Sequence, residues 1–199
     1  SQRAMAAAVL DALDRGRILL VEAGTGTGKT LAYLVPAVLS GKKVVVSTGT
    51  QALQDQLAGP DLPIIEAALG REVDWCVMKG RENYLCLYRL EDAERFGGSS
   101  PEAVGAMRAW ADATETGDRA ELSWLADDDP LWERFSVTAE QCLGSACPRF
   151  EPCFLTQVKR RAARADVVIV NHALFFADLA LGPHAAGSVV PRHAAVVFD

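Results

Sequence analysis

Residues 23–30 read AGTGTGKT, a glycine-rich run that ends in lysine and threonine. It follows a short apolar stretch at 18–21, which predicts a strand, and precedes LAYLVPAVL at 31–39, whose apolar residues recur at helical spacing. A strand, a glycine-rich turn and a helix that opens on Lys-Thr form the setting of a phosphate-binding loop. The run therefore predicts a site for a nucleoside triphosphate.

The chemistry of this loop explains its residue types. Glycines let the backbone N–H groups turn inward toward an anion, and the start of the following helix adds partial positive charge there. Lys29 can reach the β- and γ-phosphates, and the Thr30 hydroxyl can hold Mg²⁺. A glycine-rich loop before an ordinary helix is the alternative, but the GKT ending and both flanks favour a nucleotide site. The predicted contacts are Ala23, Gly24, Thr25, Gly26, Thr27, Gly28, Lys29 and Thr30.

Composition sets limits on the class of protein. A chain of 199 residues that is 50% apolar can bury a core as one large or two small domains. The net charge is −6, but residues 91–133 hold twelve acidic and three basic side chains, so the rest of the chain is slightly basic. A local basic patch can bind a phosphate backbone even on an acidic protein.

No apolar run approaches the roughly 20 residues that a membrane-spanning helix needs, and no signal-peptide pattern opens the chain. We therefore expect a cytoplasmic protein. A first residue other than methionine and a strand-like last segment are typical of part of a longer chain.

The order of elements predicts the fold class. Apolar runs at 44–48, 73–78, 166–171 and 194–199 predict strands, and helical patterns lie at 4–16, 31–39 and 50–57. Strands that alternate with helices indicate an α/β fold with a parallel sheet covered by helices, whose ligands lie at the carboxyl ends of the strands. The β-branched run at 44–48 does not alternate, so we expect it to be buried on both faces.

Residues 79–158 break this rhythm. They hold four of the five cysteines, the acidic stretch and expected helices at 101–116 and 118–126. Trp110, Trp124 and Trp132 lie in the same segment and predict a second apolar cluster. We therefore expect one domain from residues 1–78 and 159–199, interrupted by an insertion domain at 79–158.

Asp199 follows the apolar run AVVF and matches the Walker B position, where a strand-end aspartate holds Mg²⁺. The alternative is an aspartate that caps a helix, and the phosphate-binding loop favours the Walker B assignment.

The cysteines indicate a metal site. In an intracellular chain, structural disulfides are not expected, and four thiols point to a metal instead. The spacing is one cysteine, a gap of 55 residues, then C-x4-C-x5-C. This wide spacing favours an iron–sulfur cluster over zinc, which stays the alternative, and unligated buried cysteines are a third reading. The candidate ligands are Cys86, Cys142, Cys147 and Cys153, whereas Cys76 matches an ordinary buried thiol.

Taken in order, these segments resemble the DinG branch of the XPD-like iron–sulfur helicases, within helicase superfamily 2. AGTGTGKT is similar to motif I, STGTQALQDQL (47–57) to motif Ia, and MKGRENYLC (78–86) to the segment with the first cluster cysteine. The cysteines at 142–153 match the other three ligands. ADVVIVNHALFFADL (165–179) resembles the segment before motif II, and VVFD (196–199) the start of a DEAH box.

The resemblance implies a RecA-like P-loop motor domain of an ATP-dependent 5′→3′ DNA helicase, bacterial and serving DNA repair or replication. It implies that Lys29, Thr30 and Asp199 act at the ATP and magnesium site, and that the four cysteines hold a [4Fe–4S] cluster. Gln2 falls where a Q-motif glutamine contacts adenine. The implied partners are single-stranded DNA and duplex junctions, which places such a protein at the bacterial nucleoid. The motif II glutamate and the second motor domain would follow Asp199, so residues 1–199 alone are expected to bind ATP but hydrolyse it poorly.

Candidate DNA contacts come from motif Ia and from basic residues. Gly49 stands where motif Ia commonly has histidine, so contacts there would come from the backbone, Thr48 or Thr50.

The basic residues flank the cysteines on both sides and could form one phosphate-binding surface. Solvated helix-face charges are the alternative. Tyr84 and Phe150 could stack on bases or pack around the cluster. His172 is expected to be a hydrogen-bonded structural residue, with a motif residue near the nucleotide edge of the sheet as the alternative. The basic candidates are Lys79, Arg81, Lys159, Arg160, Arg161 and Arg164.

Two other functions are compatible with these residues. A DinG-like nuclease would need an exonuclease domain, of which residues 1–199 hold no trace. A redox-responsive, ATP-gated DNA-binding module would bind DNA without unwinding it.

Overall fold

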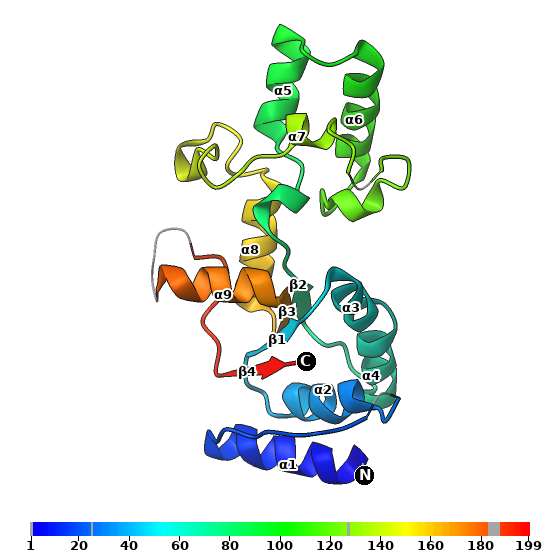
Figure 1. The fold of residues 1–199 in the computed structure, drawn as a ribbon, viewed down its shortest axis with the longest axis vertical. Helices are drawn as coiled ribbons and strands as arrows, with labels where there is room; N and C mark the ends of the chain where they lie inside the picture. The colour runs from blue at the N-terminus through cyan, green and yellow to red at the C-terminus, as the bar shows by residue number, and fades with distance from the viewer. Residues whose placement is uncertain (1, 25, 127, 183–187) are drawn as a thin grey trace. The chain divides into compact units, whose positions relative to one another are not determined.

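A computed structural model describes residues 2–24, 26–126, 128–182 and 188–199 (Figure 1). The chain divides into two compact units, one of Ser1–Met78 with Arg161–Asp199 and one of Lys79–Arg160. The expected insertion spans 79–158, and the structure places the second boundary inside a helix, α8 (Phe154–Arg164).

The first unit is built on a four-stranded parallel sheet with the order β2-β3-β1-β4. In β1 (Val44–Thr48) every residue is buried, as the unbroken β-branched run predicts, and in β3 (Val167–Asn171) all but the last are. These two strands form the centre, with β2 (Trp75–Val77) and β4 (Ala195–Phe198) on either side. The prediction of an α/β fold with a parallel sheet is confirmed, and the arrangement is consistent with a RecA-like domain.

The helices of this unit are α1 (Gln2–Arg15), α2 (Lys29–Leu39), α3 (Gln51–Gln56), α4 (Leu62–Leu69) and α9 (His172–Leu181). A π-helical turn at Leu57–Asp61 joins α3 to α4. Figure 1 shows α1 alongside α2, and apolar side chains of both helices join those of β1 and β3 in one core. This core fixes α2, and with it the end of the glycine-rich loop.

The predicted strand at 18–21 is not formed. Ile18 and Leu20 are 96% and 93% exposed, and no strand pairs with this segment within the described parts of the chain. An apolar run becomes a strand only when its N–H and C=O groups find a neighbouring strand, and a local sequence pattern does not reveal that neighbour. The strand expected at 73–78 is also shorter, since only Trp75–Val77 pair with β3.

The second unit is mainly helical. Its helices are α5 (Leu87–Phe96), α6 (Pro101–Ala113), α7 (Trp132–Phe135) and the start of α8, with 3-10 turns at Arg81–Asn83, Arg119–Glu121 and Gly144–Ala146. Buried apolar side chains form its interior, among them Leu90, Met107, Trp132 and Phe135. None of the helices in the described ranges is long and apolar enough to span a bilayer.

Two expectations for the second unit are corrected. Trp110 and Trp132 pack edge to face with ring centroids 6.3 Å apart, but Trp124 is 53% exposed and lies outside the apolar cluster. The helix expected at 118–126 is only the short turn Arg119–Glu121. The Asp118 carboxylate accepts from the Ala120 N–H at 3.0 Å, a local bond that competes with helix formation.

Candidate nucleotide and nucleic-acid sites

The glycine-rich loop leads directly into α2, which begins at Lys29. Gly26 and Gly28 have φ of 72° and 76°, a left-handed conformation that favours glycine. Thr27 Oγ1 donates to the Gly24 carbonyl at 2.8 Å, which closes the turn. Lys29 and Thr30 are therefore the first two residues of a helix, where unpaired N–H groups and the helix dipole attract an anion. Thr25 lies outside the described residues.

Gln2 lies against this loop. Its Nε2 donates to the Gly28 carbonyl at 3.1 Å, across 26 residues of sequence. A Cβ on Gly28 would approach Gln2 Nε2 to 2.5 Å, so glycine allows the close contact. The first turn of α1 thus meets the loop, and the adenine contact of Gln2 stays a prediction.

Tyr33 joins two of the predicted magnesium ligands. Its hydroxyl donates to Asp199 Oδ2 at 2.8 Å and also has a side-chain hydrogen bond with Thr30. Burial, followed by the hydrogen bond to Asp199, raises the pKa of Tyr33 far above its ordinary value, so the phenol stays protonated and donates. Asp199 is held at the carboxyl edge of the sheet because its N–H donates to the Ser47 carbonyl at 2.9 Å.

Sequence reasoning missed Tyr33. Its position offered a signal, because residue 33 follows Thr30 by one helical turn and so lies on the same face of α2.

At the end of β1, the hydroxyl groups make structural contacts. Thr48 is fully buried and its Oγ1 donates to the Thr50 carbonyl at 3.0 Å, so the expected contact of its hydroxyl with DNA is wrong. Thr50 is exposed and caps α3, where its Oγ1 accepts from the Leu53 N–H at 3.2 Å. Ser47 Oγ lies 2.7 Å from His172 Nδ1, which confirms a hydrogen-bonded histidine.

Lys79 does not belong to a basic surface. Its side chain is 3% exposed, and its Nζ lies 2.8 Å from Asp118 Oδ2, so its charge is paired inside the second unit. The expected contact of Lys79 with DNA is corrected for this reason, since a buried ammonium is not presented to phosphates. Tyr84 is likewise buried, at 4% exposure, and is not available for stacking on a base.

The remaining basic candidates differ in exposure. Arg81 is half-buried and donates to the Ala139 carbonyl at 3.3 Å, and Lys159 is also half-buried. Arg160 is exposed, pairs with Glu151 at 2.9 Å, and lies 6.0 Å above the Phe150 ring. Three exposed arginines remain, all on α8. They lie one, three and four residues apart, so they occupy neighbouring positions on the helix surface. We call them the α8 arginines: Arg160, Arg161 and Arg164.

The four candidate cysteines are half-buried and none forms a disulfide. Cys86 stands at the N-cap of α5, and its side chain makes no capping hydrogen bond there. Burial raises the pKa of Cys86, the neighbouring backbone at the start of α5 partly offsets this, and Cys153 and Cys147 add smaller increases. Three of the four sulfurs are therefore near enough to interact electrostatically.

A single-ion site is not formed by these side chains. Within the described ranges, no three or more His, Cys, Asp or Glu side chains gather closely enough to hold one metal ion. A multi-iron cluster keeps its thiolates further apart than a single zinc ion does, and its ligands are thiolates alone. The donor set of four thiols, one at a helix N-terminus, fits such a cluster in its chemistry.

Comparison with known proteins decides the family. A DEAD/DEAH box helicase family model matches residues 2–94. The whole chain is 44% identical to the ATP-dependent DNA helicase YoaA of Escherichia coli (strain K12), of which it covers 32%. It is 41% identical over its whole length to the ATP-dependent helicase DinG of Mycobacterium tuberculosis (strain H37Rv), of which it covers 33%.

The chain therefore carries a DEAD/DEAH helicase domain and is homologous over its whole length to the YoaA and DinG helicases. It spans about a third of the length of these helicase relatives. A further relative, the 3'-5' exonuclease DinG of Bacillus subtilis (strain 168), is 34% identical over 89% of the chain, which covers 20% of that protein. The DEAD/DEAH match includes the glycine-rich loop and α3.

Proposed function

We propose that this chain is the ATP-binding part of a DNA helicase that uses ATP hydrolysis to move 5′→3′ on single-stranded DNA and to unwind duplexes, in DNA repair or replication. The observation that carries the proposal is the hydrogen bonding of Tyr33. Its hydroxyl bonds both to Thr30, next to the glycine-rich loop, and to Asp199 at the edge of the sheet. The helicase relatives YoaA and DinG are named as ATP-dependent, which supports the same activity.

In this proposal each residue at the loop has one task. The loop N–H groups and Lys29 bind the phosphates, which are the charges that a helix N-terminus and an ammonium attract. Thr30 and Asp199 offer the hard oxygen ligands that Mg²⁺ prefers. Tyr33 orients the Asp199 carboxylate, and Gln2 adds a contact to the adenine.

The insertion at 79–158 is proposed to hold a [4Fe–4S] cluster on Cys86, Cys142, Cys147 and Cys153. When bound, the cluster would tie together loops that hold few helical turns, such as the segment 136–153. A brown protein with absorption around 400 nm and about four irons and four sulfides per chain supports the cluster. One zinc per chain without sulfide would refute it.

Single-stranded DNA and duplex junctions are the proposed partners. Thr50 and the α8 arginines are exposed and carry groups that contact phosphates. Arg81 and Lys159 are secondary candidates because they are half-buried.

The experiment uses the full-length protein, purified without oxygen. We expect ATP hydrolysis that single-stranded DNA stimulates, and strand displacement on a 5′-tailed duplex but not on a 3′-tailed one. Lys29→Ala should abolish both activities, whereas Arg15→Ala, an exposed change in α1, should leave both unchanged. Displacement only from 3′ tails would refute the direction. ATP-dependent DNA binding without displacement of any duplex would instead support the redox-responsive binding module.

A further inference from the structure

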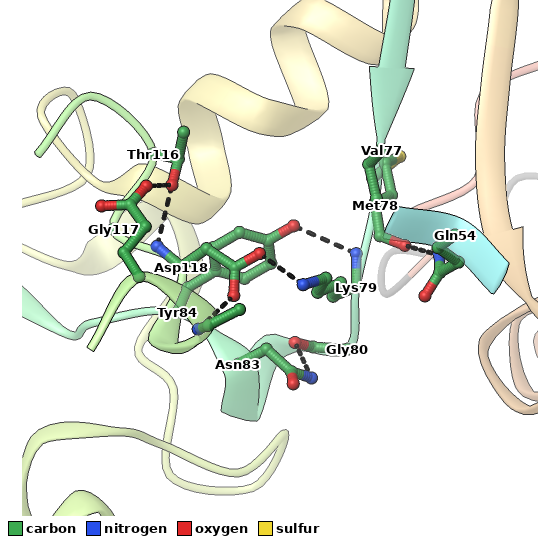
Figure 2. Close-up of polar contacts among 12 residues, drawn as sticks. Gln54, Val77, Met78, Lys79, Gly80, Asn83, Tyr84, Thr116, Gly117 and Asp118 are labelled. Atoms are coloured by element: carbon green, nitrogen blue, oxygen red, sulfur yellow. Dashed lines mark hydrogen bonds and ion pairs between the residues drawn. The ribbon is translucent and has the colours of Figure 1, made fainter. Parts of the chain in front are cut away.

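The chain passes between the two units at two peptide groups: one joins Met78 to Lys79, and the other lies within α8, between Arg160 and Arg161. The first of them is held by a side chain from each unit. Its carbonyl, on Met78, accepts a hydrogen bond from Gln54 Nε2 at 3.1 Å. Its N–H, on Lys79, donates to the Tyr84 hydroxyl at 3.0 Å. Figure 2 shows both bonds: Gln54 belongs to the first unit and Tyr84 to the second, and they hold opposite sides of one peptide plane. Because a peptide group is planar, fixing both its C=O and its N–H fixes the orientation of the whole plane.

On the first unit, Gln54 connects this peptide to α3. Its side chain is fully buried, and its Nε2 also lies 3.4 Å from the carbonyl of Ile169, the middle residue of β3. Both neighbours of the Gln54 amide are carbonyl groups, and only its NH₂ group can donate a hydrogen bond. The NH₂ end must therefore face them. Gln54 Oε1 is buried without a hydrogen-bond partner, an unfavourable state that an apolar side chain would avoid. The glutamine is therefore present for its NH₂ group.

The strand side of the junction is also ordered. The Met78 N–H donates to the Ile169 carbonyl at 2.8 Å, which continues the pairing of β2 with β3 by one residue. The helix that carries Gln54 is capped by Thr50, one turn earlier, and Thr50 is a proposed DNA contact. A displacement of α3 would thus reach the Met78 carbonyl directly.

On the second unit, Tyr84 lies in a tightly bonded segment that we call the root: residues 79–86. Lys79 Nζ pairs with Asp118 Oδ2 at 2.8 Å, and Tyr84 forms an antiparallel bridge with Asp118. The Leu85 N–H donates to the Gly117 carbonyl at 2.9 Å. The Asp118 N–H donates to Thr116 Oγ1 at 3.0 Å, so its own loop is held in turn (Figure 2). The root ends at Cys86, a proposed cluster ligand.

We propose that Gln54 and Tyr84 are positioning residues that couple α3 to the insertion through the Met78–Lys79 peptide. When ATP turnover displaces α3 along DNA, the peptide plane carries that displacement into the root, and so into the domain that carries the proposed cluster. This coupling rests on the proposed function as a helicase. The coupling implies that the two activities can be lost separately. ATP hydrolysis needs the glycine-rich loop and Asp199, whereas strand separation needs the insertion to move with α3.

The test uses full-length protein with Gln54→Met, Tyr84→Phe and the double variant. Each single change removes one hydrogen bond from the junction peptide and keeps the volume of the side chain close to the original. We expect DNA-stimulated ATP hydrolysis within about twofold of the unaltered protein, and a three- to tenfold drop in base pairs unwound per ATP, roughly the effect of one hydrogen bond. Gln56→Met, an exposed change on the same helix, and Tyr88→Phe on α5 should leave both quantities unchanged.

The double variant decides between coupling and two unrelated defects. If both side chains act through one peptide, breaking either bond breaks the link, so the double variant should be no worse than the worse single variant. Losses that multiply, or ATP hydrolysis that falls in parallel with unwinding, would overturn the coupling. If Gln54→Met does not fold, Tyr84→Phe alone decides, since an unchanged ratio of unwinding to ATP would overturn it. Failure of the unaltered protein to unwind DNA would overturn the proposed function, and the coupling with it.

Discussion

The Tyr33 hydroxyl donates a hydrogen bond to Asp199 Oδ2 at 2.8 Å, across 166 residues of sequence. Tyr33 lies in the second turn of α2, the helix that follows the glycine-rich loop, and Asp199 directly follows β4, an edge strand of the sheet. Because Tyr33 is 3% exposed, little water competes for this bond. The phenol therefore holds one carboxylate oxygen in place and leaves the other for a cation.

Replacing Tyr33 with phenylalanine should weaken the binding of magnesium–ATP. The lost hydrogen bond is worth about 1 kcal/mol, which corresponds to roughly a fivefold higher Kd. Calorimetry with ATP and Mg²⁺ measures this effect, and the same titration in EDTA should show little change, because the tyrosine acts through Asp199. An equal loss with and without Mg²⁺ would show that Tyr33 supports the loop instead. Tyr88→Phe, on α5 of the second unit, is the control.

Two glycines of the second unit should respond to alanine with opposite signs. Gly117 has φ of 63°, and a Cβ there would overlap the Phe154 ring, so Gly117→Ala should destabilise the protein by about 2 kcal/mol or more. Gly105 lies inside α6 with open space around its Cβ position, so Gly105→Ala should stabilise by about 0.5–1 kcal/mol. Urea unfolding measures both. A loss at Gly105, or no loss at Gly117, would contradict the local backbone described for the second unit.

The sequence was most informative where the physical cause is local. The run at 44–48 predicted a strand buried on both faces because β-branched residues without alternation suit the centre of a parallel sheet, and β1 is that strand. The helix after the glycine-rich loop followed from its apolar spacing, and α2 begins where the lysine stands.

The errors arose where the cause is distant in sequence. The run at 18–21 has the composition of a strand, but pairing depends on a neighbour that composition does not specify. Lys79 is basic and was therefore a candidate DNA contact. In the structure it is buried and pairs with Asp118, which lies 39 residues further along the chain. Tyr33 and Gln54 were missed for the same reason, since each acts through a group that only the folded chain brings near.

Cys76 should resist alkylation until the solution is strongly basic. Burial raises the pKa of its thiol to about 11, so at pH 8 only about one thiol in a thousand is ionised. Because the thiolate is the reactive form, the rate of labelling by iodoacetamide should rise about tenfold per pH unit up to that value. Peptide mass spectrometry at several pH values measures the rate, and the same protein in urea is the control. Equal rates for native and unfolded protein at pH 8 would contradict the burial of this thiol.

The α8 arginines should govern the salt dependence of DNA binding. Replacing Arg160 and Arg161 with glutamine removes two exposed cations, which should lower the slope of log K against log salt by about 1.4, at about 0.7 per phosphate contact on single strands. Binding of a labelled oligonucleotide at several salt concentrations gives this slope. Arg15→Gln, an exposed change on α1, is the matched control. A weaker affinity with an unchanged slope would show that the arginines do not contact phosphates.

Lys79 should behave in the opposite way, because its charge is paired rather than exposed. Lys79→Met leaves Asp118 with an unpaired carboxylate in a mostly buried setting, and should destabilise the protein by about 3 kcal/mol. The salt slope of DNA binding should stay the same in the folded variant. Pairing Lys79→Met with Asp118→Leu removes both charges and should recover a large part of the lost stability, as measured by urea unfolding. A double variant that is less stable than Lys79→Met alone would show that Asp118 stabilises its loop independently of Lys79. If Lys79→Met lowered the slope of log K against log salt for DNA binding, Lys79 would be a phosphate contact after all.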